Sequence, residues 1–440
     1  RVVNEESVRV MVRKHCFFSF SILPLSFLLL ATFYRSSRPL TDLYCYVDGG
    51  NSTEEEESIV PFLIDISEEE VDSMRGLAAE SILSTSFHDP LLHNLTKRLT
   101  NFEWKQHQFF LNTFKQFKTK IEGLEIHFIQ ASVKSDMAKE TIAPLLVLPG
   151  LASSFWHFYK LLPILSNPSR FGFSFGHSNR TLRFDIVVPS LPSLLFSQSH
   201  QNVRRADMAW LADKLMRRLY LSRYFVYGGE GTGAEMAILL GSLFPSHLHG
   251  VIVSNPALPE DSLRCRLLAL LSPPTPSPLS VYSSLRSLLP PPGIQLTLLF
   301  LTYLTVEEMK SPIDLLTWQL SVWRSTTTSK DPLEEQFTFD DILIETALFW
   351  FTRLSRSSQL SLSSSQLHLH QSRVNVPCCV VQTANAPWQS SPCAVSEKFI
   401  STVRIRELER GGLFHSIQES PALAKEIFSF AEEILYPDNN

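Results

Sequence analysis

The stretch Tyr224-Phe-Val-Tyr-Gly-Gly-Glu-Gly-Thr-Gly233 decides the fold of this chain. Its first four residues are typical of a buried strand, and residues 234–244 are typical of a helix. Glycines flank Glu230, because a sharp strand-to-helix turn pushes its central residue toward positive φ and leaves the neighbours little room. The sequence therefore predicts a tight turn that projects the Glu230 side chain, the layout of a nucleophile elbow.

Short runs with strand character surround this turn. They are residues 124–129, 145–148, 185–188, 224–227 and 376–382. Helical patterns lie between the middle runs, and two later helical segments, 312–324 and 339–352, follow Pro-rich stretches. Because strands and helices alternate, we expect an α/β fold with a mostly parallel sheet and a helical insertion between its later strands.

The composition excludes some classes of protein. The chain has 440 residues, of which 44% are hydrophobic, so it can bury a large core. Its net charge of −5 and the lack of a basic stripe argue against nucleic acid as a partner. Six cysteines without metal-ligand spacing indicate buried free thiols and no metal site. The alternative is one bridge, from Cys378 or Cys379 to Cys393, if the body is luminal.

The N-terminal part contains an uncharged segment. Residues 16–34 are 19 residues without a charge, enough for a helix across about 30 Å of hydrocarbon. We expect a membrane anchor here, with a cleaved signal peptide or a buried helix as alternatives. Sequons at Asn51, Asn94 and Asn179 serve as glycan acceptors only in a luminal or extracellular body, and chance also explains them.

Three features precede the first strands. Residues 35–60 resemble a solvated linker with an acidic run. Ser67 and Glu70 have the spacing of a capping box, which predicts a helix start. Residues 101–118 carry apolar side chains at helical spacing.

Several segments together resemble the microsomal-type epoxide hydrolases. They are residues 62–70, 102–104, 117–128, 145–154, 184–192, 228–233 and 337–343. Juvenile-hormone epoxide hydrolases are similar in the N-terminal meander. The resemblance covers roughly residues 60–435 and implies an α/β-hydrolase fold with a helical cap. Members of that family open an epoxide with an elbow Asp, which forms an ester, and then hydrolyse the ester with a His oriented by an acid.

The resemblance also implies a division of the chain. The parts are an N-terminal segment at 1–15, a transmembrane anchor at 16–34, a linker at 35–60, the meander at 61–125, the core at 126–255 and 372–435, and the cap at 256–371. It further implies a single-pass protein of the endoplasmic reticulum membrane.

Glu230 occupies the nucleophile position of the family, one methylene longer than Asp. Displacement of a reacting atom by about 1 Å can lower a rate about 10²-fold. Two interpretations follow. Glu230 is either an impaired nucleophile or a turn carboxylate bound by nearby backbone N–H groups.

The base and acid positions are also altered. The family's Gly-Gly-His-Phe is Gly411-Gly-Leu-Phe414 here, so Leu413 lies at the base position. His415, two residues later, is either a substitute base or an ordinary loop or helix-start histidine. An ungapped match puts Ala386 at the acid position, and Glu397 fits only with a long gap.

The groups that would bind substrate are reduced as well. In the oxyanion turn at residues 149–154, the backbone of Leu151, with that of Gly231, could still donate hydrogen bonds. Two cap Tyr side chains hold the epoxide oxygen in the family. Residues 360–362 contain no phenol, and Tyr303 has no secure register.

These losses predict a pseudoenzyme without a cofactor, which binds a small apolar ligand or a protein partner. The alternative is an active hydrolase that converts epoxides to vicinal diols through a Glu230 ester with His415 as base. A scaffold at the membrane with no ligand pocket is a third hypothesis.

Overall fold

The computed structural model describes most of the chain beyond residue 57. The ranges are 58–84, 89–132, 139–150, 153–177, 180–192, 194–198, 205–229, 231–258, 310–325, 332–353, 373–386 and 389–437, with Val203, Ser262, Arg264 and Cys265. They belong to one compact unit, Asn51–Asn440. In these ranges no helix has the length and apolarity needed to cross a membrane. Outside them lie the anchor predicted at 16–34, the linker up to residue 57, and Asn51, Leu151, Asn179, Glu230, Tyr303 and residues 360–362.

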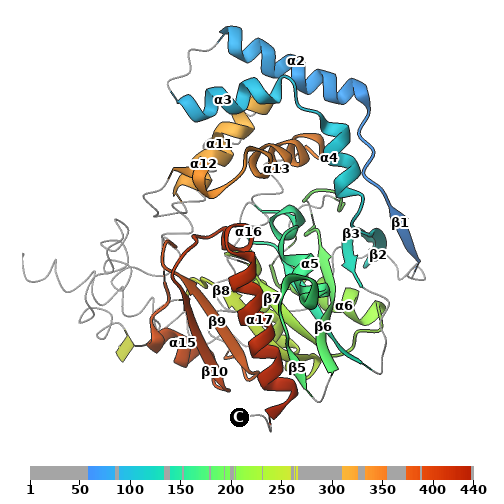
Figure 1. Ribbon diagram of the computed structural model, residues 1–440. Coiled ribbons are helices and arrows are strands. Elements are labelled where there is room, and N and C mark those ends of the chain that lie inside the picture. Colours follow the sequence, from blue (N-terminus) through green and yellow to red (C-terminus); the bar gives the residue numbers. More distant parts are fainter. Residues whose placement is uncertain are drawn as a thin grey trace, which may run out of the picture. The chain divides into compact units, whose positions relative to one another are not determined.

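Ten strands of the described residues form one mixed sheet (Figure 1). They are β1 (Ile59–Phe62), β2 (Gln116–Ile121), β3 (Leu124–Ala131), β4 (Glu140–Leu148), β5 (Gly176–His177), β6 (Arg180–Pro189), β7 (Tyr224–Gly228), β8 (Leu248–Ser254), β9 (Cys378–Thr383) and β10 (Val403–Leu408). The order is β1-β2-β3-β6-β4-β7-β8-β9-β10, with β5 paired to β6. All neighbours from β6 to β10 are parallel, so the predicted mostly parallel sheet is confirmed.

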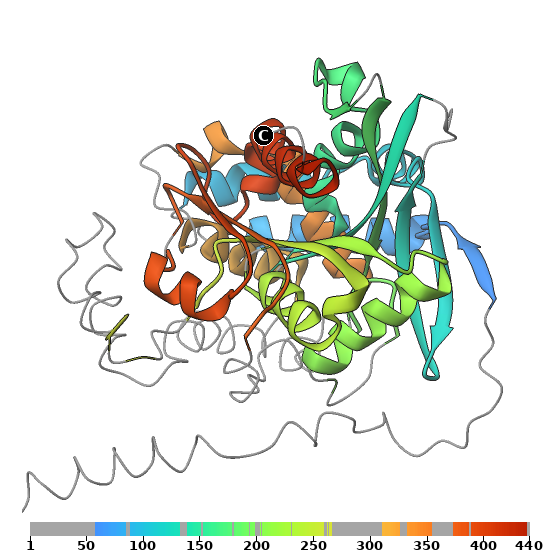
Figure 2. The same ribbon diagram turned by 90° about the horizontal axis from the view of Figure 1, so that it is seen from below.

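The central strands are buried on both faces. Every residue of β7 and β9 is buried, as their continuous apolar sequences predict. Helices α5 (Leu161–Ser166) and α17 (Ser420–Leu435) lie on one face, and α6 (Arg205–Arg218) and α7 (Thr232–Leu243) on the other (Figure 2). Successive side chains of β7 therefore contact opposite layers: Tyr224 donates a hydrogen bond to Asp213 of α6, and the Phe225 ring lies 6.2 Å from that of Phe430 in α17.

In its described part, from residue 58 onward, the N-terminal segment adds three helices and the antiparallel strands. The helices are α2 (Glu68–Ser84), α3 (Pro90–Leu99) and α4 (Trp104–Leu111). The predicted capping box is present at α2, where Ser67 Oγ accepts from the Glu70 N–H at 3.2 Å and Glu70 accepts from the Ser67 N–H at 3.3 Å.

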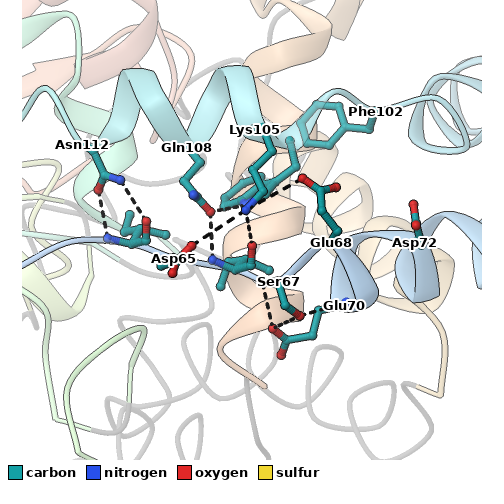
Figure 3. Close-up of polar contacts among 12 residues, drawn as sticks. Asp65, Ser67, Glu68, Glu70, Asp72, Phe102, Lys105, Gln108 and Asn112 are labelled. Carbon is teal, nitrogen blue, oxygen red and sulfur yellow. Dashed lines mark hydrogen bonds and ion pairs between the residues drawn. The ribbon is translucent and has the colours of Figure 1, made fainter.

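Helix α4 holds the chain that leads into α2 (Figure 3). The Asn112 side chain accepts from the Ile64 N–H at 2.9 Å and donates to the Ile64 carbonyl at 2.8 Å. Gln108 accepts from the Ile66 N–H at 2.9 Å, and Lys105 donates to the Ile66 carbonyl at 2.6 Å. These side chains satisfy backbone groups of a segment that has no strand neighbour there.

The helical pattern predicted for residues 101–118 is wrong in its second half. Helix α4 ends at Leu111, and Gln116 already belongs to β2. Phe117 pairs in register with Phe128 of β3, and the two rings stack 5.6 Å apart. Cross-strand packing of the two rings thus outweighs the local helical spacing.

Residues 310–325 and 332–353, which are described within the region predicted as the cap, form three helices. They are α11 (Pro312–Ser325), α12 (Leu333–Gln336) and α13 (Phe339–Phe351). Helix α11 contacts α13, α2 and α3. The Arg324 guanidinium binds both carboxylate oxygens of Asp89, the N-cap of α3, at 2.5 and 3.1 Å. The cap helices therefore pack against the N-terminal helices as well as the core.

The shorter helices complete the described fold. They are η2 (Phe155–Phe158), η3 (Pro168–Phe171), η4 (Pro245–His247), α15 (Pro392–Lys398) and α16 (His415–Gln418). Cys393 of α15 forms a disulfide with Cys265. The free thiols that the sequence indicates are confirmed for Cys378 and Cys379, which are buried in β9, and are wrong for Cys265 and Cys393. The alternative of one bridge is correct, but the partner of Cys393 is Cys265 and not Cys378 or Cys379.

Candidate active site

The predicted strand-turn-helix is present at the carboxyl end of β7. Gly229 donates its N–H to the Leu148 carbonyl at 2.9 Å, and α7 begins at Thr232. Gly231, at the helix N-cap, has a φ of 68°, a conformation that glycine adopts without strain. Glu230, the predicted central residue of the turn, lies outside the described residues.

The start of helix α7 packs directly against the end of β4. A Cβ atom on Gly233 would lie 2.5 Å from the Leu148 carbonyl oxygen and 2.6 Å from that of Pro149. A Cβ on Gly229 would lie 3.0 Å from the Gly150 nitrogen. The elbow and the turn predicted to carry the oxyanion donors are therefore neighbours. Of the two predicted donors, the structure describes Gly231 and not Leu151.

The acid and base positions lie together, and both are apolar. Ala386 and Leu413 are 5% and 2% exposed and pack against each other and against Ala257. An imidazole and a carboxylate in these places would form the acid–base pair that hydrolyses an ester. The side chains present have no atom that exchanges a proton, so this contact supports no general base catalysis.

A hydrogen-bond network fixes the loops that carry these two residues. The Asn255 side chain, just beyond β8, accepts from the Thr383 N–H at 2.9 Å and donates to Thr383 Oγ1 at 3.1 Å. Thr383 Oγ1 in turn donates to the Gly412 carbonyl at 3.1 Å. The three loops are thus connected by hydrogen bonds, and two of them carry Ala386 and Leu413.

His415 has a different environment from the one a substitute base would need. It is fully buried at the start of α16, and its Nε2 lies 3.1 Å from Ser254 Oγ. The same Oγ lies 3.0 Å from the Tyr227 hydroxyl. The Nε2 atom of His415 is therefore part of a hydrogen-bonded chain with two hydroxyl groups at the ends of β7 and β8. This favours an ordinary helix-start histidine over a substitute base.

The structure also contains a buried polar cluster that the sequence did not predict. Ser154 Oγ donates to Glu345 Oε2 at 2.5 Å, and His157 Nε2 lies 3.6 Å from Glu345 Oε1. Burial raises the pKa of Glu345 to about 8, and the hydrogen bond from Ser154 opposes this only in part. Burial lowers the pKa of His157 to about 3. Both groups are therefore neutral near pH 7.

This cluster joins the predicted oxyanion turn to the cap. Ser154 precedes η2, and Glu345 lies in α13. Beside it, Asp341 accepts hydrogen bonds from the Tyr159 hydroxyl at 2.8 Å and from Lys160 at 3.3 Å. One feature of the sequence could have revealed this cluster. Glu345 is an acidic residue in the apolar run from Ile342 to Phe351, and an ionisable group among apolar neighbours needs a partner.

Comparison with known families identifies the N-terminal segment. Residues 59–158 match the family described as "Epoxide hydrolase N terminus". This range runs from β1 to η2 and includes the turn that carries Ser154.

Known proteins resemble nearly the whole chain. "Epoxide hydrolase 1" of Oryctolagus cuniculus is 28% identical over 418 residues, which cover 86% of this chain and 89% of the relative. "Juvenile hormone epoxide hydrolase 1" of Ctenocephalides felis is 25% identical over 363 residues, which cover 75% of this chain and 74% of the relative.

Solved structures share the architecture. The juvenile hormone epoxide hydrolase of the silkworm Bombyx mori superimposes with a TM-score of 0.75 at 25% identity, covering 88% of this chain and 97% of that chain. The Aspergillus niger epoxide hydrolase superimposes with a TM-score of 0.65 at 20% identity, covering 86% and 97%, which shows the fold alone.

Proposed function

We propose a binding role without catalytic turnover for this chain, which belongs to the epoxide hydrolase family. The ligand class we infer is a small apolar molecule. The observation that supports the proposal is the contact of Ala386 with Leu413, because the resemblance to the family implies an acid and an imidazole at these two positions and both residues carry alkyl side chains. A protein partner is the second candidate for what this fold binds.

The second step of the reaction is the one that fails. An ester formed at Glu230 would need a water molecule deprotonated by a base, and general base action typically contributes about 10²–10⁴-fold to a rate. His415 is the only replacement that the sequence suggests, and its Nε2 is hydrogen bonded to Ser254. Alkylation without hydrolysis is thus the most that this site supports.

We propose in addition that residues 16–34 anchor the protein in the endoplasmic reticulum membrane. The support is the length of the uncharged segment. Retention of the full chain in membranes after carbonate extraction is the expected result. A soluble product that starts near residue 35 would instead establish a cleaved signal.

The decisive experiment incubates the full chain, purified in detergent, with a generic aryl epoxide under single-turnover and multiple-turnover conditions. We expect no diol in steady state. A stable mass increase of one adduct per chain, absent in Glu230→Gln, would locate an ester at the elbow. Sustained turnover that disappears in Glu230→Gln or His415→Ala would overturn the proposal and establish the active hydrolase.

The binding role has its own test. The same epoxide's unreactive ether analogue should bind the wild-type chain saturably in calorimetry. Leu413→Asp should weaken this binding at least tenfold, whereas Leu413→Met should change it little, because only the first substitution puts a charge in the apolar contact. A chain that binds no analogue at all would favour a scaffold with a filled interior.

A further inference from the structure

A carboxylate lies beside the disulfide that joins Cys265 to Cys393. The two sulfur atoms and a carboxylate oxygen of Glu397 all lie within 4.8 Å of one another. The described part of the chain holds no second group of three such ligand atoms at this spacing. Spacing along the chain does not reveal the group, because Cys265 and Cys393 are 128 residues apart. Three side chains of kinds that bind transition metals therefore meet at one place.

Helix α15 positions two of these side chains. Its N-cap Ser391 accepts a hydrogen bond from the Ala394 N–H at 3.1 Å, and Ala394 and Val395 are buried, so the helix has a fixed rotation against the core. Cys393 and Glu397 are four residues apart and therefore lie on the same face of the helix. Both are half-buried, so solvent reaches this face.

Cys265 supplies the third ligand from a distant segment. Its N–H donates to Ser262 Oγ at 3.0 Å, and its side chain is fully buried. Two thiolates on one tetrahedral zinc ion, with Zn–S bonds of about 2.3 Å, have their sulfur atoms about 3.8 Å apart. Because the Cα atoms of Cys265 and Cys393 lie 5.5 Å apart, rotation about the Cα–Cβ bonds brings the two sulfurs to that separation.

The ligand set fits zinc better than calcium or magnesium. Zinc binds thiolates and carboxylates with bonds of about 2.0–2.3 Å, usually four of them in a tetrahedron, whereas calcium and magnesium prefer oxygen ligands throughout. Two sulfurs and one oxygen from the protein leave one position for water. Burial raises the pKa of the other two described thiols, Cys378 and Cys379 in β9, so neither offers a thiolate that would compete for the ion.

We propose that Cys265, Cys393 and Glu397 form a zinc site under redox control. The reduced protein binds one zinc ion through the two thiolates and the carboxylate, and the oxidised protein carries the disulfide and no metal. The two states exclude each other, because the neutral sulfurs of a disulfide lack the negative charge with which a thiolate binds zinc. Both states connect the segment at Cys265 to α15.

The change of state is a two-electron exchange. With hydrogen peroxide as oxidant, one thiolate attacks a peroxide oxygen, the O–O bond breaks, and a sulfenic acid and a hydroxide ion form. The second thiolate attacks the sulfenic sulfur, the S–O bond breaks, and the disulfide and a second hydroxide ion form. The zinc ion is released. A dithiol reverses the change, since it becomes a disulfide itself, and the two recovered thiols lose their protons when zinc binds again.

Zinc binding is tested on the full chain purified in detergent. The protein is reduced with a phosphine, stripped with a chelator, equilibrated with zinc without oxygen, and assayed for bound metal by elemental mass spectrometry. We expect one zinc ion per reduced wild-type chain and none per oxidised chain. Loss of a partner outside the ligand shell typically lowers metal affinity about 10–100-fold, so Cys265→Ser and Cys393→Ser should each lower it at least about 100-fold, and Glu397→Gln at least about tenfold.

Cys378→Ser is the matched control, because it removes a buried thiol outside the site and should keep one zinc ion. A reduced wild-type chain without zinc would overturn the proposal. So would an equal loss of zinc in Cys378→Ser, because it would place the ion elsewhere.

Cobalt in place of zinc gives a measurement that needs no variant. The strength of the visible bands of cobalt(II) distinguishes a tetrahedral from an octahedral site, and near-ultraviolet charge-transfer bands report bound thiolates. The reduced wild-type chain should show a tetrahedral site with two thiolates. An octahedral spectrum without charge-transfer bands would refute the site even if metal is retained.

Redox control is tested by adding hydrogen peroxide to the zinc-loaded wild type. We expect release of one zinc ion, detected with a zinc-binding dye, together with the loss of two thiols counted by maleimide labelling. A dithiol with added zinc should restore both. Loss of two thiols while zinc stays bound would show that the ion and the bridge occupy different places, and the proposal would fail.

Discussion

Leu413 and Ala386 are in contact and almost fully buried, so a polar group introduced at either position must find a partner inside the protein. At the scale of single residues, the proposed absence of catalysis depends on these two side chains. The loops around them are connected through Thr383, which accepts and donates hydrogen bonds between them.

The double change Leu413→His with Ala386→Asp should behave non-additively. Each single variant buries an unpaired polar group and should lower the free energy of unfolding by about 1–3 kcal/mol. In the double variant the carboxylate can accept a hydrogen bond from the imidazole, so we expect a favourable coupling of about 0.5–3 kcal/mol. Urea unfolding of the four proteins measures this, and strict additivity would show that the two side chains do not meet.

Glu345 gives the protein a pH dependence with a definite sign. Its pKa of about 8 in the folded state lies above its ordinary value of 4.5, so the folded protein binds the extra proton between these two values. Stability contributed by this group is therefore complete below about pH 4.5 and is lost as pH rises through about 8. His157, with its pKa lowered to about 3, acts oppositely, because its contribution is lost as pH falls through about 3.

We expect Glu345→Gln to flatten the fall in stability between about pH 4.5 and pH 8, because glutamine does not ionise. Each unit of pKa separation is worth about 1.4 kcal/mol, so the wild type should lose a few kcal/mol that the variant keeps. The groups facing Glu345 are Ser154 and His157 from η2 and its N-cap, with Asp341 on its own helix. Parallel pH profiles of melting temperature for both proteins would contradict this assignment.

At the scale of elements, the sequence predicted most strands because their apolar residues are consecutive. Strands β4, β7 and β9 are buried on both faces, which leaves a clear hydrophobic run in the sequence. The end of α4 was missed because the spacing of the aromatic residues there fits a helix, whereas the pairing of Phe117 with Phe128 is a contact between strands.

Only those parts of the candidate site that are formed by consecutive residues could be predicted from the sequence. The elbow glycines and the position of Leu413 are local signals that a motif reveals. The contact of Ser154 with Glu345 joins residues 191 apart, and no local pattern encodes it. For the same reason the sequence did not identify Cys265 as the partner of Cys393, since spacing in sequence says little about pairing across 128 residues.

Two glycines in helices should respond oppositely to alanine. Gly76 lies inside α2, and a Cβ there would meet no heavy atom within 4 Å, so Gly76→Ala should stabilise the protein by about 0.5–1 kcal/mol. Gly233 begins α7 against the end of β4, where a Cβ would lie 2.5 Å from a carbonyl oxygen. Gly233→Ala should therefore cost about 1–3 kcal/mol. Thermal unfolding of both variants checks this, and equal shifts in melting temperature would refute the close approach.

At the scale of the whole molecule, the N-terminal segment contacts both the central sheet and the cap. Strands β1 and β2 extend the central sheet, while α2 and α3 contact α11 of the cap. The cap helices are thus held by the N-terminal helices and by the hydrogen bonds of Asp341 and Glu345.

Reduction of the bridge should lower the stability of the whole body. Closing a loop of 128 residues removes conformations from the unfolded chain, and native bridges typically contribute about 2–4 kcal/mol. We expect a reductant to lower the melting temperature of the wild type, and Cys393→Ser to show the lower value with or without reductant. Any remaining effect of reductant on Cys393→Ser would point to another bridge.

The order of the strands has a consequence for solubility. The two outer strands, β1 and β10, each expose backbone groups to which a strand of another molecule could add. Strand β1 is only four residues long and contains Pro61, which donates no hydrogen bond. Strand β10 carries Arg404 and Arg406, paired with Glu433 and Glu426 of α17 at 3.0 and 3.3 Å. Both borders are therefore protected against edge-to-edge aggregation, and a concentrated solution of the protein should remain dispersed.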